Sequence, residues 1–272
     1  MWDIVVQIFP YAVAYTIPLL MTALGALYCE RSGVINIGLD GFMIVGSFAG
    51  ALTITKLQQS MGPGNNMTIW IGLLVAAIVG AIFSLLHAFA SINLNADQTI
   101  SGTAINMMAG ALTVFLARTI TGSGRIRITN GFYQMDIPGL SQIPILGDLL
   151  FKKTYITTWV SLAILILSSF LIYKTRFGLR LRACGEHPQA ADAAGINVYR
   201  MRYIGVLLSG ALSSFAGAVI LVTFSGEFNG SVAGLGFLAL AGLIFGQWKP
   251  LGILAATAFF GFATTVANVS QV

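Results

Sequence analysis

Residues 174–202 read KTRFGLRLRACGEHPQAADAAGINVYRMR, a basic stretch that interrupts an otherwise apolar chain. It holds six of the 14 Lys and Arg residues. Apolar runs long enough to cross a bilayer flank it on both sides, at Tyr155–Tyr173 and Tyr203–Phe224. Because basic residues gather in the cytoplasmic loops of membrane proteins, we expect a cytoplasmic loop between two transmembrane helices.

The composition excludes a soluble protein. Hydrophobic residues make up 57% of the 272 residues, charged residues only 8%, and the mean hydropathy is +0.86. Soluble domains carry about 25% charged residues, so lipid must cover much of this surface. The net charge of +5 is explained by basic residues in cytoplasmic loops, which set the orientation of the protein in the membrane. The sequence has no nucleic-acid-recognition motif and no basic patch interleaved with aromatic residues, so it gives no indication of nucleic-acid binding.

A span needs about 20 mostly apolar residues. A shorter run, Leu235–Trp248, suits a tilted or re-entrant helix packed within protein. We therefore predict an all-α, polytopic bundle of about seven to nine transmembrane or re-entrant helices, forming one transmembrane domain over residues 1–272. The predicted spans are Phe9–Tyr28, Leu39–Thr55, Ile69–Ile92, Ile100–Ile120, Tyr155–Tyr173, Tyr203–Phe224 and Leu251–Val269.

Counting spans back from the cytoplasmic loop 174–202 places the N-terminus outside and residues 121–154 in an external loop. The basic residues Arg125, Arg127, Lys152 and Lys153 in that loop count against this orientation. The loop either forms a cap that contacts a delivery protein or is an ordinary connection. Cys29 and Cys184 both fall on the cytoplasmic side, so we expect reduced thiols.

Small residues recur at a spacing of four, which lets helix backbones approach closely in lipid. A weak internal repeat relates Gly41–Gly46 to Gly236–Gly242, and transporters are often built from such repeats. The small-residue rows are Gly46 with Gly50, Gly242 with Gly246, and Ser209, Ser213 and Gly217.

Polar residues within apolar segments are candidates for a translocation pathway. Ser32–Gly41 predicts a broken, loop-like segment packed in the interior. In it, Asn36 and Asp40 could line a pathway, or Asp40 could instead be a carboxylate held by backbone amides at a helix start.

Asp97 is a candidate cap of the next helix, and Thr103 and Asn106 project along that helix. These side chains could bind a polar, uncharged solute or a neighbouring helix. A third polar group, Ser225–Ser231, lies outside, where Glu227 and Asn229 face entering solute or simply solvent.

Enzymatic motifs are absent from the sequence. It has no GxxxxGK[ST] phosphate loop, no nucleophile elbow and only His87 and His187. Neither histidine has metal-ligand spacing to a carboxylate or cysteine. We expect no catalytic residue, no metal and no cofactor of its own.

Within the basic loop, Pro188 and Gly195 stand where a short helix would begin and end. A helix of about two turns is not stable alone, so it needs a docking surface or a rigid base. Its alanines make it narrow enough to enter a groove on another protein; the alternative is a plain connector.

Three segments resemble the permease subunits of bacterial ABC importers for branched-chain amino acids, simple sugars and nucleosides. They are ERSGVINIGLDGFMIVGSF (Glu30–Phe48), GLRLRACGEHPQAADAAGINVYRMR (Gly178–Arg202) and GLGFLALAGLIFGQWKPLG (Gly234–Gly252), and the first is most similar to the nucleoside branch. The family usually continues past Val272 with another helix and a basic tail, so we expect a truncated or divergent C-terminus.

The resemblance implies a multi-pass protein of the bacterial cytoplasmic membrane with three protein partners. These are a cytoplasmic ABC ATPase, a second permease subunit, identical or homologous, and an extracytoplasmic solute-binding protein or lipoprotein. It also implies that the ATPase contacts Glu186, His187, Pro188, Ala190, Ala191, Asp192, Ala194 and Gly195. Nucleosides are the expected solute, with sugars or branched-chain amino acids as alternatives and an ion-coupled secondary transporter as a different class.

Overall fold

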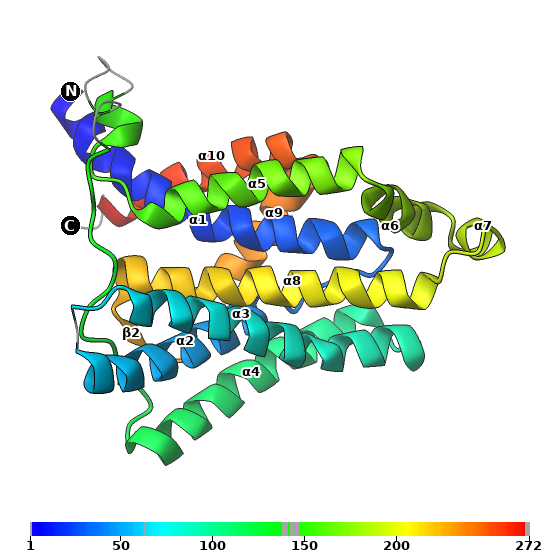
Figure 1. Ribbon diagram of the computed structural model, residues 1–272, viewed down its shortest axis with the longest axis horizontal. Helices are drawn as coiled ribbons and strands as arrows, with labels where there is room; N and C mark the ends of the chain where they lie inside the picture. Colours follow the sequence, from blue (N-terminus) through cyan, green and yellow to red (C-terminus); the bar gives the residue numbers. More distant parts are fainter. Residues whose placement is uncertain (1, 63, 138–140, 142–146, 270–272) are drawn as a thin grey trace.

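The computed structural model describes residues 2–62, 64–137, 141 and 147–269, and its long helices run along the long axis of the molecule (Figure 1). Helices α1 to α5 are Trp2–Arg31, Leu39–Met61, Met67–Ala88, Gln98–Thr121 and Ile156–Lys174, and helices α6 to α10 are Arg176–Glu186, Pro188–Ala193, Val198–Ile220, Leu235–Phe245 and Pro250–Val269. The π-helical turns η1 (Phe89–Asn93) and η4 (Leu221–Ser225) extend α3 and α8, and η3 (Gly147–Phe151) precedes α5. Strand β1 (Ile126–Arg127) pairs antiparallel with β2 (Glu227–Phe228).

Six helical segments of the described chain are long and apolar enough to cross a membrane, which confirms the predicted all-α, polytopic fold. They are Ile8–Arg31, Met67–Asn93, Gln98–Thr121, Ile156–Lys174, Val198–Ser225 and Pro250–Asn268. The predicted span Leu39–Thr55 is not among them. It becomes α2, whose glycines and polar residues lower its hydropathy and whose surroundings are protein.

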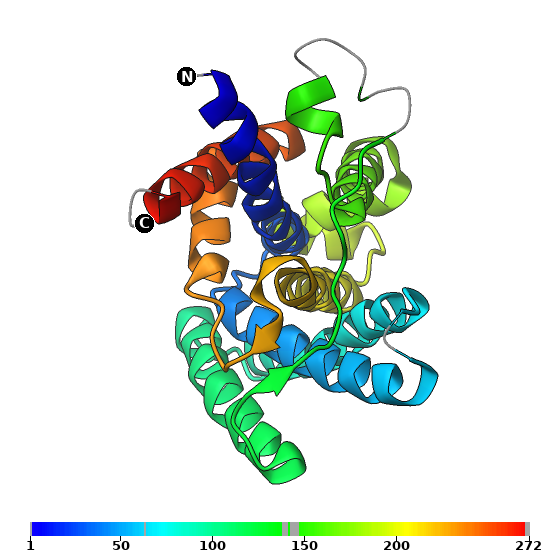
Figure 2. The ribbon, with the colours of Figure 1, turned by 90° about the vertical axis from the view of Figure 1, so that its left-hand side faces the viewer.

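Helices α1, α2 and α8 form the centre of the bundle. The apolar stretch of α1 is 89% buried and that of α8 is 67% buried, against 28–33% for α3, α4, α5 and α10. Figure 2, which looks along the bundle, shows α1 and α8 surrounded by the other helices. Large apolar side chains such as Leu74, Met107 and Ile166 are exposed on the outer helices, as a lipid-facing surface requires.

Glycines bring α2, α3 and α8 into backbone contact, as the small-residue rows predict. A Cβ atom on Gly46 would lie 1.9 Å from the carbonyl oxygen of Ser214, and one on Gly217 would lie 1.9 Å from that of Met43. A Cβ on Gly80 would meet the Ser214 hydroxyl at the same distance. The centre of the bundle therefore tolerates no larger residue at these three positions.

The two ends of the bundle differ. Helices α6 and α7 project from one end, which we call the α7 end (Figure 1). The start of α1, the end of α10, the β1–β2 pair and η3 lie at the opposite end, which we call the β end.

The predicted external loop 121–154 lies at the β end, and its residues 138–140 and 142–146 fall outside the described part. Ile126 and Ile128 are buried, and the Gln58 side chain of α2 donates to the Asn130 carbonyl at 2.8 Å and accepts from Thr129 N at 3.0 Å. Phe132 N donates to the Val222 carbonyl at 2.9 Å. This part of the loop packs against the bundle and covers its end.

Candidate functional site

The α7 end begins with a helix that the sequence reasoning missed. Helix α6 starts at a Thr175 cap, whose hydroxyl accepts from Gly178 N at 3.2 Å. Gly178, Leu181 and Cys184 are buried at a spacing of three, the pattern of a helix with one face on the protein. That burial pattern and the Thr cap were the signals that the sequence offered, and the three arginines of the helix obscured them.

Helix α7 follows directly, with Pro188 at its first position and Gly195 just beyond its end, as predicted. Gly195 has φ +78°, a backbone conformation that favours glycine, and its N–H donates to the Asp192 carbonyl at 2.8 Å. Ala191 is buried, whereas most of the predicted contact set is exposed: Glu186, His187, Ala190, Asp192, Ala194 and Gly195. The segment presents a narrow, accessible surface.

The short helix has the rigid base that its length requires. A Cβ on Gly185 would lie 2.4 Å from the Arg31 carbonyl oxygen, so the end of α6 touches the end of α1. The Arg182 guanidinium lies 5.3 Å from the centre of the Tyr173 ring of α5. Helix α7 is therefore connected to the bundle through α6.

Between α1 and α2 the chain forms the predicted broken segment, Ser32–Gly38, and Ser32, Val34 and Asn36 are buried. Its backbone polar groups cannot pair as in a helix, so side chains must satisfy them. Gln98 Oε1 accepts from Ile35 N at 2.7 Å, and the His87 ring lies 3.1 Å from the Ile35 carbonyl oxygen. His87, which the sequence reasoning set aside, is thus a buried support of this segment.

Asn36 and Asn106 each bond within the protein. Asn36 Nδ2 donates to the Ser209 hydroxyl of α8 at 2.9 Å, and its Oδ1 accepts from Gly38 N at 3.0 Å. Asn106 Nδ2 donates to the Ile37 carbonyl at 3.0 Å, and its Oδ1 accepts from Gly41 N at 2.7 Å. The two amides tie α8 and α4 to the broken segment.

Asp97 and Thr103 lie on the exposed side of α4. Asp97 caps the helix, as predicted, accepting from Thr99 N at 2.9 Å and Ile100 N at 3.0 Å. The Thr103 hydroxyl donates to the Thr99 carbonyl at 2.8 Å. The structure does not bring these two residues to Asn36, Asp40 and Asn106.

Asp40 joins two helix starts. It is the second residue of α2, and its Oδ1 accepts from Gly236 N, in the first turn of α9, at 2.9 Å. Helix α2 runs from here to the β end, where Thr55 bonds to the Arg127 carbonyl, while α9 runs to the α7 end. The two N-termini face each other, so their partial positive charges both favour a carboxylate between them.

This junction combines the two segments that the internal repeat related. A Cβ on Gly236 would lie 2.3 Å from Asp40 N, so the backbones touch. Sequence reasoning placed Asp40 at a helix start but not its partner, because the donor is 196 residues away.

The other end of α9 is held by a second cluster that the sequence reasoning missed. Gln247 and Trp248 both have positive φ, at 52° and 54°, which non-glycine residues rarely adopt. The Trp248 indole donates to the Glu30 carboxylate, and Arg31 donates to the Trp248 carbonyl at 3.0 Å. The end of α1 thereby fixes the turn between α9 and α10.

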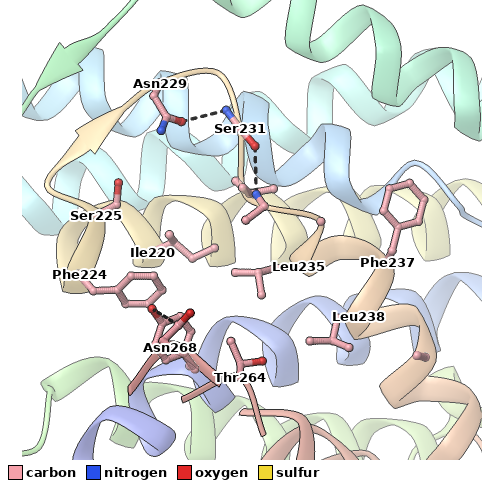
Figure 3. Close-up of a pocket in the computed structure, with 15 residues that line it drawn as sticks. Ile220, Phe224, Ser225, Asn229, Ser231, Leu235, Phe237, Leu238, Thr264 and Asn268 are labelled. Atoms are coloured by element: carbon pink, nitrogen blue, oxygen red, sulfur yellow. Dashed lines mark hydrogen bonds between the residues drawn. The ribbon is translucent and has the colours of Figure 1, made fainter. Parts of the chain in front are cut away.

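A cavity of about 820 Å³ opens beside the start of α9, towards the β end (Figure 3). Phe224 and Phe237 stand on opposite sides, Asn229 and Ser231 above and Asn268 below. Its lining, drawn from α1, α8, η4, the loop after β2, α9 and α10, contains no charged residue. No three His, Cys, Asp or Glu side chains gather as a metal site in the described part of the chain.

The chain is similar to known permeases over almost its whole length. The family described as branched-chain amino acid transport system, permease component, matches residues 9–272. Guanosine ABC transporter permease protein NupQ of Bacillus subtilis is 46% identical over 266 residues, covering 97% of this chain and 82% of that protein.

Two further relatives extend the comparison. Nucleoside ABC transporter permease protein NupC of Lactococcus lactis is 43% identical over 94% of this chain and 80% of its own length. Putative glucose ABC transporter permease protein TsgC13 of Haloferax volcanii is 33% identical over 93% of this chain and 74% of its own length.

Proposed function

This chain belongs to the permease-component family of branched-chain amino acid transport systems, and we propose that the solute it passes is a nucleoside. It is a multi-pass membrane protein and a transport subunit, not an enzyme. The single observation that carries the nucleoside assignment is the 46% identity to a guanosine permease along 97% of the chain. Glucose, named for a relative at 33% identity, is the second candidate solute.

The chemistry of the interior supports an uncharged solute. The cavity at the β end is lined by aromatic, aliphatic, amide and hydroxyl groups. A zwitterionic amino acid would lose the hydration of two charges there without a compensating charge, which is costly. A nucleoside presents an uncharged aromatic base and hydroxyl groups, which such a lining can bind.

The permease works with three proteins in this proposal. A second permease subunit completes the pathway within lipid, a cytoplasmic ABC ATPase supplies the energy, and an extracytoplasmic binding protein delivers the solute to the β end. The α7 end then faces the cytoplasm, and α7 with its flanking residues, Glu186 to Gly195, enters the ATPase. The supporting observation is that this segment is exposed and firmly attached to the bundle.

In this proposal the polar residues near the pathway have two roles. Asn36, Asp40 and Asn106 hold the broken segment and the start of α9 in place beside the solute. Asp97 and Thr103 line the outer face of α4, which faces the second permease subunit.

The test is uptake by the complete complex in proteoliposomes. We expect ATP-dependent uptake of radiolabelled guanosine that requires the binding protein and is competed by other nucleosides but not by glucose or leucine. Competition by glucose alone would move the assignment to a sugar. Guanosine uptake by this chain alone, driven by a proton or sodium gradient, would instead identify a secondary transporter.

The coupling role has its own test. The variant Ala190→Asp adds a charge to an exposed position of α7, and Ser60→Asp adds the same charge at the exposed far end of α2 as a matched control. We expect only Ala190→Asp to separate ATP hydrolysis from guanosine uptake. Equal coupling in both variants would contradict the assignment of α7.

A further inference from the structure

The cavity of Figure 3 combines aromatic rings with amide and hydroxyl groups, a lining that suits a specific ligand. Rings from three separate elements reach it: Tyr15 of α1, Phe224 of η4 and Phe237 of α9. The Tyr15 and Phe224 rings lie 4.6 Å apart between centroids, at an interplanar angle of 40°. Phe237 stands on the opposite side and is 50% exposed.

Two amides add hydrogen-bonding groups of opposite kind. Asn268 Nδ2 donates to the Tyr15 hydroxyl at 3.1 Å, which leaves its carbonyl oxygen to accept from a ligand. Asn229 Oδ1 accepts from Ser231 N at 3.1 Å, which leaves its NH₂ group to donate. A nucleobase offers both donors and acceptors, so it can pair with groups of either kind.

The size and position of the cavity also fit a small solute. Its volume of about 820 Å³ lies within the ~300–1,000 Å³ that is usual for small-molecule sites. Gly234, which precedes α9, and Leu235 and Leu238 of α9 contribute to its wall, and Gly236 in the first turn donates to Asp40. A ligand in the cavity would therefore rest on the helix start that Asp40 holds.

We propose that this cavity is a solute-binding site in which Phe237, opposite Tyr15 and Phe224, stacks on the base of a nucleoside while Asn229 and Asn268, on opposite walls, bind its polar groups. The proposal rests on the proposed function, because it names where the nucleoside pauses between the β end and the Asp40–Gly236 junction. The rings provide affinity for an aromatic base, and the uncharged lining excludes amino acids and phosphorylated nucleotides.

The deciding experiment measures the KM of guanosine uptake by the complete complex carrying Phe237→Ala. Loss of one base–aromatic stack, worth ~1–3 kcal/mol, should raise KM about 5- to 150-fold. Phe237→Tyr keeps the ring and should restore a KM close to that of the unmodified complex. Phe262→Ala is the matched control, because Phe262 is 48% exposed on α10 and does not line the cavity.

A second variant tests the exclusion of charge. Asn229→Asp places a carboxylate at the exposed cavity wall, where folding tolerates it, and should lower guanosine uptake at least several-fold at neutral pH. Melting temperatures of the purified complexes establish that each variant is folded.

The outcomes separate the two proposals. If the unmodified complex carries guanosine but Phe237→Ala and Phe262→Ala have equal KM values, the cavity is not the solute site and the proposed function stands. That result would also follow if lipid or the second permease subunit filled the cavity. If the unmodified complex carries glucose and no nucleoside, both proposals fail.

Discussion

Replacing Asp40 tests the junction between α2 and α9 most directly. Its carboxylate accepts from Gly236 N at 2.9 Å and faces the N-termini of both helices. Asp40→Asn keeps the shape and an accepting oxygen but removes the charge. A charge-assisted hydrogen bond is worth ~1.5–3 kcal/mol, against ~0.5–1.5 for a neutral one, and each helix dipole adds ~0.3–1 kcal/mol. We expect Asp40→Asn to lower the free energy of unfolding by about 2 kcal/mol.

Asp40→Ala should cost more, because it removes the acceptor and leaves a buried backbone N–H without a partner, at about 1–3 kcal/mol further. The assay is the melting temperature of the detergent-solubilised protein. For a chain of this size ~1 kcal/mol corresponds to about 2–4 °C, so we expect a fall of roughly 4–8 °C for Asp40→Asn.

The matched control is Asp97→Asn, which changes a carboxylate at the start of one exposed helix. Asn caps helices about as well as Asp, so this change should shift the melting temperature by less than about 2 °C. If Asp40→Asn were equally mild, the carboxylate would not be holding two helix starts together and the electrostatic reasoning would be refuted.

Three further predictions concern other parts of the bundle. Gly217→Ala, whose Cβ would lie 1.9 Å from the Met43 carbonyl oxygen, should cost at least ~1–3 kcal/mol and lower the melting temperature, whereas Gly64→Ala, with open space around it, should not. Trp248→Phe removes the indole donor to Glu30 and should lower the melting temperature by an amount equivalent to ~1–3 kcal/mol. An unchanged melting temperature would show that the turn between α9 and α10 does not depend on the bond to Glu30. Burial raises the pKa of the Cys184 thiol, so maleimide should label it slowly at pH 7 and faster as the pH rises beyond the ordinary thiol range. The measurement uses a Cys29→Ser background, so that Cys184 is the thiol that is labelled. An exposed cysteine introduced by Gln189→Cys is the control and should react readily at pH 7. Rapid labelling of Cys184 at pH 7 would contradict its burial.

Much of the fold could be predicted because apolar length and helix punctuation are local signals. The outer spans are apolar runs facing lipid, and Asp97, Pro188 and Gly195 stand at helix boundaries that their own chemistry favours. The predicted span Leu39–Thr55 lies within α2, which is surrounded by protein, and composition alone does not distinguish lipid from protein as the surrounding medium. Helix α2 is apolar enough to be buried and contains glycines because other helices touch it.

The interior contacts could not be predicted, because they join residues far apart in the sequence. Gly236 donates to Asp40, and Trp248 donates to Glu30, each across about 200 positions of the sequence. His87 supports the Ile35 carbonyl from another helix. Each polar residue was recognisable as unusual within an apolar segment, but its partner is set by how the broken segment and α9 fold into the bundle.

Helix α9 connects the two sites proposed above. Its first turn forms part of the cavity wall and is bound by Asp40, and the turn after its end is bound by Glu30, Arg31 and the Tyr173 hydroxyl, 3.4 Å from the Trp248 carbonyl oxygen. The ring of Tyr173 in turn lies against the Arg182 guanidinium of α6. In the proposed complex, a displacement of α6 by the ATPase would reach α9, a helix of only 11 residues, through these contacts. Because the start of α9 is bound by the Asp40 carboxylate and also lines the cavity, the Asp40–Gly236 junction is where such a movement would change the proposed solute site.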